Sequence, residues 1–158
     1  MLLCAIAVVA CGDKRGTPFA VKVTPALRAA VAEACADPVH GSDIKTEVPG
    51  AVQSQGRCYL RLDLEEDTQT ITRLVFGGAE SFARAEMIMR EIIMPLLTPE
   101  MRRFIEERVL ADLGADKTVD LDRPGRAEIH FRNRSLHYVD DDLRPIPSPN
   151  LLLTIEPR

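Results

Sequence analysis

The stretch that decides the fold is RCYLRLDL (residues 57–64), which is followed by the polar connection EEDTQ (65–69) and then by TITRLVF (70–76). In the first segment apolar and polar residues alternate, which is the period of a half-buried β-strand. Its apolar positions are Cys58, Leu60, Leu62 and Leu64. In the second segment Thr72, Leu74 and Phe76 share one face.

These two strands, 57–64 and 70–76, are expected to form an antiparallel pair. If their apolar faces match, Leu62 lies opposite Thr72. The same register puts Cys58 opposite Phe76, so that the Cys58 sulfur points at whatever covers the sheet.

Three helices are predicted to supply that cover. Each begins at a hydroxyl residue that can act as an N-cap, namely Thr24, Ser81 and Thr98. Proline follows the first and the third of these caps, and apolar residues recur at helical spacing behind all three. The first helix should end at Cys35.

The last third of the chain is strand-like, with predicted strands at 126–131, 135–139 and 151–156 and a proline-rich connection at 144–149. Strands, then helices, then strands predict an α+β fold. We expect a mostly antiparallel sheet with about three helices packed on one face.

Between the first helix and the first strand lies a long polar segment, residues 38–56, rich in Gly, Ser, Pro and Gln. It shows no period of its own and is predicted to be a loop. Loops of this length are uncommon in compact domains unless they bind something or are held in place.

Residues 2–10 carry no charge, and nine residues are about half of the roughly twenty that a transmembrane helix needs. Their length is typical of the apolar region of a signal peptide. The alternative is that residues 2–11 form a buried N-terminal strand.

The end of this run, Val8-Val9-Ala10-Cys11, resembles the lipobox of bacterial lipoproteins. No Lys or Arg precedes the run, which departs from the usual signal. The resemblance implies that residues 1–10 are a signal peptide and that Cys11 receives a diacylglycerol anchor, with palmitate among its acyl chains. Residues 11–17 would then form a lipidated tether and 18–158 a single α+β domain in the periplasm, anchored to a membrane of the cell envelope.

On this reading the four cysteines are accounted for. Cys4 leaves with the signal and Cys11 carries lipid, which leaves Cys35 and Cys58 in a compartment that permits disulfides. We predict that these two residues are joined.

The charges and motifs exclude several functions. Lys plus Arg total 20 and Asp plus Glu 24, and the two signs are interspersed, which disfavours nucleic acid as a partner. The sequence contains no Gly-x-Ser-x-Gly elbow, no His-Glu-x-x-His pair and no phosphate-binding glycine loop. We therefore expect no cofactor and no enzymatic activity.

One set of residues suits a metal. If Asn133-Arg134 forms a turn, His130 lies opposite His137 and Glu128 shares their face, and two imidazoles with a carboxylate could bind zinc with an open position. The alternative is that these residues form an exposed polar face of the sheet and bind no metal. A metal-dependent hydrolase using Glu128, His130 and His137 is accordingly the competing function.

The favoured hypothesis is a non-enzymatic module that binds a protein partner in the envelope. It could be an inhibitor or immunity protein directed against a toxin or a wall-degrading enzyme. Loops on rigid scaffolds commonly carry recognition, so the predicted partner-binding residues are Asp43, Lys45 and Glu47 in the long loop.

Overall fold

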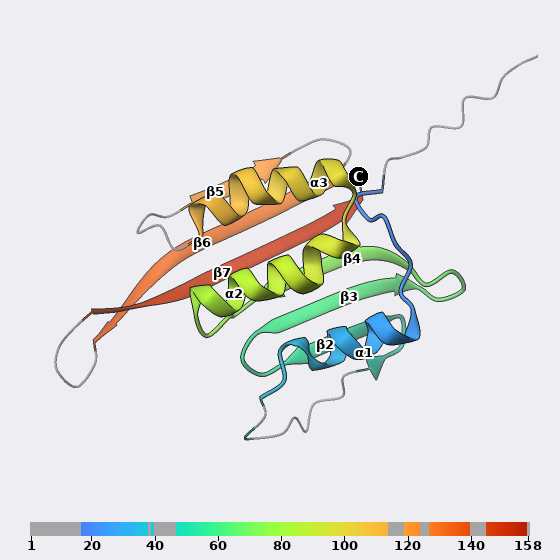
Figure 1. The fold of residues 1–158 in the computed structure, drawn as a ribbon, viewed down its shortest axis with the longest axis horizontal. Helices are drawn as coiled ribbons and strands as arrows, with labels where there is room; N and C mark the ends of the chain where they lie inside the picture. The colour runs from blue at the N-terminus through green and yellow to red at the C-terminus, as the bar shows by residue number, and fades with distance from the viewer. Residues whose placement is uncertain are drawn as a thin grey trace, which may run out of the picture.

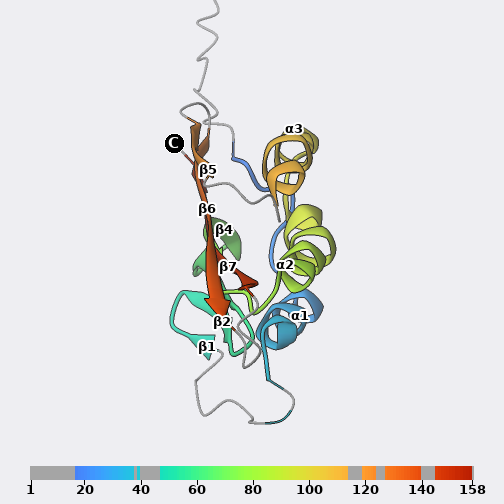
Figure 2. The same cartoon turned by 90° about the vertical axis from the view of Figure 1, so that its left-hand side faces the viewer.

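The computed structural model describes residues 17–37, 39, 47–113, 119–123, 127–139 and 145–157. They form an antiparallel seven-stranded sheet with helices packed on one of its faces, so the predicted α+β class is confirmed (Figures 1 and 2). The order across the sheet is β1-β2-β3-β4-β7-β6-β5. The strands are β1 (Glu47–Val48), β2 (Ala51–Gln55), β3 (Tyr59–Glu65), β4 (Thr70–Gly77), β5 (Val119–Arg123), β6 (Ala127–Val139) and β7 (Pro145–Pro157).

The three helices start where the sequence predicts. They are α1 (Pro25–Ala34), α2 (Phe82–Ile88) and α3 (Pro99–Phe104). The hydroxyl oxygens of the three predicted caps, Thr24, Ser81 and Thr98, each accept a hydrogen bond from the backbone N–H three residues on, at 3.2, 3.1 and 3.4 Å. These bonds satisfy donors that a helix start leaves without an intrahelical partner.

A π-helical turn and then a 3₁₀ turn extend each of the helices α2 and α3. After α2 come a π-helical turn (Met89–Ile93) and a 3₁₀ turn (Met94–Leu96), and after α3 come a π-helical turn (Ile105–Val109) and a 3₁₀ turn (Leu110–Asp112). Pro95 lies in the first 3₁₀ turn. Because proline lacks the N–H of a helical hydrogen bond, the helical segment ends shortly after it, at Leu96.

The apolar core lies between the helices and the sheet, and Figure 2 shows the two layers edge-on. The centre of the sheet contributes Leu60, Leu62, Leu74, Phe76, Leu153 and Ile155, and the helical layer contributes Val31, Ile88, Met89, Ile93 and Ile105. Each such side chain stabilises the fold by about 1.5–3 kcal/mol through removal from water.

The predicted register between β3 and β4 is wrong. Leu62 pairs with Leu74 rather than with Thr72, and it is Leu60, not Cys58, that lies opposite Phe76. The register shifts between Asp63 and Leu64. Such an irregularity adds one residue to one strand, so the alternation of faces along β4 is broken: Ile71 is buried, whereas Thr72 is exposed.

The prediction of a loop over 38–56 is wrong for its second half. Within residues 47–55 lie β1, at the edge of the sheet, and β2 beside it, and Val52 of β2 pairs with Leu62. The sequence of β2 shows no alternation of apolar and polar residues, because the buried residue that shares a face with Val52 is the polar Ser54, which is 1% exposed. Residues 38 and 40–46 lie outside the described part.

The predicted arrangement of the last strands is also wrong. Positions 133–134 are not a turn, since β6 runs unbroken and pairs with β7 from Ala127 opposite Pro157 to Val139 opposite Pro145. Residues 145–149 of the segment expected to be a proline-rich connection lie in the first half of β7. In Figure 1 this half of the β6–β7 pair extends away from β4.

The spacing of the prolines in β7 reconciles them with a strand. Pro145, Pro147 and Pro149 alternate, so their missing N–H groups fall on one side of the strand. The N–H groups of Ile146 and Ser148 remain available to β6. Strand β4 pairs with β7 only from Leu152 onward, so no described strand needs a donor from these prolines.

Candidate functional site

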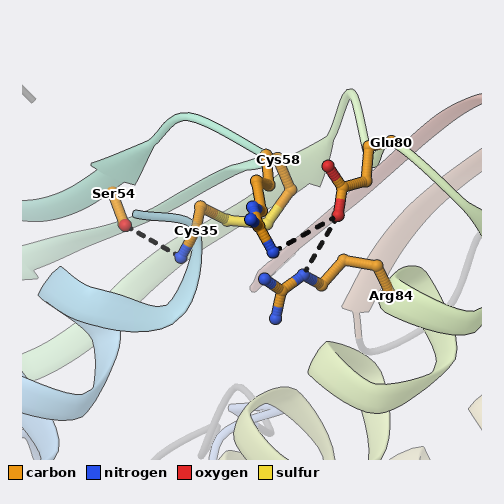
Figure 3. The surroundings of a disulfide bond; sticks show 6 residues. Cys35, Ser54, Cys58, Glu80 and Arg84 are labelled. Atoms are coloured by element: carbon orange, nitrogen blue, oxygen red, sulfur yellow. Dashed lines mark hydrogen bonds and ion pairs between the residues drawn. A yellow bond between two sulfur atoms is a disulfide. The ribbon is translucent and has the colours of Figure 1, made fainter. Parts of the chain in front are cut away.

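The end of α1, at Cys35, meets the turn between β2 and β3, at residues 56–58, and we call this place the corner. Cys35 and Cys58 form a disulfide there, with their Cα atoms 4.9 Å apart (Figure 3). Both residues are buried, at 0% and 2% exposure. The predicted cross-link is therefore confirmed.

Backbone hydrogen bonds reinforce this cross-link. The N–H of Cys35 donates to the Ser54 hydroxyl oxygen at 2.9 Å, which gives a partner to a buried polar side chain. In return, the N–H of Arg57 donates to the Cys35 carbonyl oxygen at 2.8 Å. The end of α1 is thus tied to both sides of the β2–β3 turn.

Gly56 lets the two segments approach at backbone distance. A Cβ atom at this position would lie 2.5 Å from the Cys35 carbonyl oxygen and 2.9 Å from the Asp37 nitrogen. Both contacts are too short for any side chain, and backbone atoms cannot swing aside. Only glycine therefore fits this corner without displacing the end of α1.

The corner also fixes one end of the segment 38–46. Beyond Cys35, the Asp37 carboxylate accepts a hydrogen bond from the Val39 N–H at 2.8 Å. At the other end, Glu47 is the first residue of β1 and pairs with Val52. The segment therefore starts beside a disulfide and ends at an edge strand.

A third segment, the start of α2, joins the corner. The N–H of Glu80 donates to the Arg57 carbonyl oxygen at 2.9 Å. One oxygen of the Glu80 carboxylate lies 3.9 Å from Nη1 of Arg57 and 3.9 Å from Nε of Arg84. Figure 3 shows Glu80 and Arg84 on the α2 side of the disulfide.

The helix-free face of the sheet carries charges that compensate each other. Arg61 and Asp63 on β3 are joined by a hydrogen bond of 2.6 Å, which raises the pKa of Arg61 above its usual value. Arg73 on β4 lies 3.6 Å from Glu156 on β7. In the described part of this face, these four charged side chains are therefore paired with one another.

The partner-binding and lipidation predictions fall mostly outside the described residues. Cys11, Asp43 and Lys45 lie there, and of the four only Glu47 has a described backbone, in β1. They stay predictions.

The arrangement predicted for the metal ligands is wrong. Glu128 and His130 lie two positions apart on β6, opposite Glu156 and Thr154 of β7. His137 lies on the same strand, opposite Pro147, seven positions from His130 and so about 23 Å away. Without the turn at 133–134, His137 does not face His130. Among the described residues, no three His, Cys, Asp or Glu side chains are grouped so as to hold a metal ion.

Arg57, Glu80 and Arg84 are not among the site residues predicted from the sequence. The sequence does indicate the Glu80–Arg84 pair, because these residues have the i, i+4 spacing of a helical ion pair at a capped helix start. Arg57 could have been added because it precedes Cys58, whose disulfide brings that turn to α1.

The fold and this corner define a disulfide-linked, two-layer α+β domain. No protein-family model, curated protein or solved structure is detectably similar to the chain. In the part of the chain that the structure describes, no helix is both long and apolar enough to span a bilayer.

Proposed function

We propose that this protein is a lipoprotein of the bacterial cell envelope, anchored through Cys11 and facing the periplasm, which works by binding a protein partner. Inhibition of a toxin or of a wall-degrading enzyme is the use that fits such a module. The proposal combines two arguments, one for the anchor and one for binding.

The anchor argument comes from the sequence. Val8-Val9-Ala10-Cys11 closes an apolar run of signal-peptide length. A buried disulfide is consistent with an oxidising compartment such as the periplasm, because cytosolic thiols are normally kept reduced.

One feature of the structure supports binding, namely the corner that holds the start of segment 38–46. A recognition loop loses less entropy on binding when its ends are already fixed. Here the disulfide, the Ser54 hydrogen bond and the close approach at Gly56 fix one end, and β1 fixes the other. The alternative, a metal-dependent hydrolase that uses Glu128, His130 and His137, is not favoured, because β6 continues through positions 133–134 instead of forming the hairpin that would bring His130 to His137.

The anchor is tested by fractionating cells that express the wild-type chain or Cys11→Ala. The substituted chain should mature differently from the wild type, and any form that lacks residues 1–10 should leave the membrane fraction. Cys4→Ala is the matched control and should fractionate like the wild type. A Cys11→Ala chain that fractionates and matures identically to the wild type would refute the anchor.

Binding is tested by partner capture from envelope extracts with the protein purified in detergent. Replacement of Asp43, Lys45 and Glu47 by Ala should weaken capture without changing thermal stability. The control triple Glu91→Ala, Arg103→Ala and Glu107→Ala removes the same charges from exposed helical positions and should leave capture intact. Equal capture by both triples would contradict a role for the loop.

A further inference from the structure

Two arginines at the corner share one carboxylate. The Glu80 oxygen lies 3.9 Å from a nitrogen of Arg57 and 3.9 Å from a nitrogen of Arg84. N–H···O hydrogen bonds need about 2.7–3.2 Å, so Glu80 attracts both guanidinium groups without forming a hydrogen bond to either. Two positive charges and one negative charge leave the cluster with a net charge of +1.

Other arginines of the domain are engaged more closely. Arg61 donates to Asp63 at 2.6 Å, and Arg90 donates to Glu86 at 2.9 Å. A guanidinium group carries five N–H donors in a planar fork that suits two oxygens at once. Among the described residues, the ion pairs with Glu80 use little of the donor capacity of Arg57 and Arg84.

The backbone that carries the two arginines is fixed before any ligand arrives. Arg57 lies between Gly56 and Cys58, and its carbonyl oxygen accepts from Glu80. The N–H of Arg84 donates to the Ser81 hydroxyl. Binding therefore requires little ordering of the main chain, which lowers its entropic cost.

The two arginines are also partly shielded from water. The Arg84 side chain is 21% exposed and that of Arg57 is 32% exposed, while Glu80 is 49% exposed. Partial burial weakens solvent and salt screening, so an anion placed here is attracted more strongly than at a fully exposed arginine. Glu80, the more exposed group, can move toward solvent to admit it.

We propose that Arg57 and Arg84 together form a binding site for an oxyanion, either a carboxylate or a phosphate group, which takes the place of the Glu80 carboxylate between them. The site goes beyond the proposed function and does not depend on it. Two oxygens of the ligand accept charge-assisted hydrogen bonds, one from each arginine. Glu80 competes with the ligand and keeps the empty site stable.

The test follows the side-chain Nε–H signals of the arginines by NMR while phosphate or acetate is added at constant ionic strength. The Arg84 signal should shift in a saturable manner with at least one of the two anions, and the more effective anion identifies the ligand chemistry. Arg73→Gln, on the opposite face, is the control and should leave the titration unchanged.

Two variants separate a binding site from an ordinary surface ion pair. Glu80→Gln removes the competing negative charge and should tighten anion binding about tenfold, because a unit charge about 4 Å from each arginine opposes a second anion by at least that order at a partly exposed site. In the double variant Arg57→Gln, Arg84→Gln, added anion should no longer cause saturable shifts in the NMR signals of the other residues at the corner.

Three results would overturn the proposal. They are the absence of saturation by either anion in both wild type and Glu80→Gln, unchanged affinity in Glu80→Gln, and titration that persists in the double variant. Since Glu80→Gln removes no buried contact, it keeps the test valid even if the double variant is destabilised.

Discussion

Removal of the Cys35–Cys58 cross-link should destabilise the domain without changing its fold. We consider the double substitution Cys35→Ala, Cys58→Ala, because it removes the disulfide and leaves no free thiol at either position. Val31, Leu60 and Phe76 are fully buried in the same core and should keep α1 on the sheet.

The magnitude follows from the loop that the disulfide closes. The two cysteines are 23 residues apart in the sequence. For a loop of that length, the chain-entropy model gives about 3 kcal/mol of stabilisation at 25 °C. In a domain of this size, a loss of that order lowers the melting temperature by about 10 °C.

Urea unfolding of the wild type and of the double variant measures the difference in the free energy of unfolding. Reductant should lower the stability of the wild type toward that of the variant and should leave the variant unchanged. A difference below about 1 kcal/mol, the scale of one exposed ion pair, would refute the entropic reasoning.

Tryptic mapping without reductant checks the bond itself. Cleavage after Arg28, Lys45, Arg57 and Arg61 should release peptide 29–45 joined to the short peptide 58–61. Recovery of the two peptides separately, with both thiols open to alkylation, would rule out the disulfide.

The remaining predictions concern stability and are read from thermal or urea unfolding. Gly56→Ala should lower the free energy of unfolding several times more than Gly78→Ala, because the new Cβ at position 56 meets backbone atoms. At position 78 nothing lies within 4 Å, and only the positive φ of 61° opposes alanine, at a cost of about 1–2 kcal/mol. Equal losses would contradict the close approach at the corner. Leu62→Ala should cost about 2–5 kcal/mol, since this side chain is fully buried, and a loss under about 1 kcal/mol would contradict its place in the core. Thr24→Ala should cost about 1 kcal/mol through loss of the α1 N-cap, while Thr24→Ser should be nearly neutral; equal losses from the two would argue against capping.

The features that could be predicted from the sequence are those set by local chemistry. Helix starts follow from a hydroxyl cap, because the cap needs only the backbone N–H three residues on. The strands β3 and β4 follow from alternation. The disulfide followed from the ends of two predicted elements and from the count of cysteines.

The features that could not be predicted depend on contacts distant in sequence. Strand β2 looks like a loop because its inward-facing Ser54 is polar, and the partner of its hydroxyl, the Cys35 N–H, lies 19 residues away in the sequence. The β3–β4 register cannot be read from an alternating pattern. The irregularity after Asp63 moves the partner of Leu62 by one residue, and the closing pair Glu65–Thr70 moves it by another. The prolines of β7 signal a connection, and only their alternate spacing beside β6 makes them compatible with a strand.

For the candidate site, the same division holds. The sequence pointed to the segment after Cys35 as the place of recognition, and the structure adds the backbone contacts that hold the start of that segment. The cluster of Arg57, Glu80 and Arg84 arises from three segments meeting at the corner, which no single stretch of sequence displays.

The measurement that tests the proposed function most directly is site-specific photo-crosslinking in living cells. A photoreactive residue at position 43 should give one discrete adduct with an envelope protein in the membrane fraction. The same residue at position 103, exposed on α3, should give none. Absence of an adduct from position 43, or the same adduct from both positions, would contradict the account of a membrane-anchored module that binds its partner through segment 38–46.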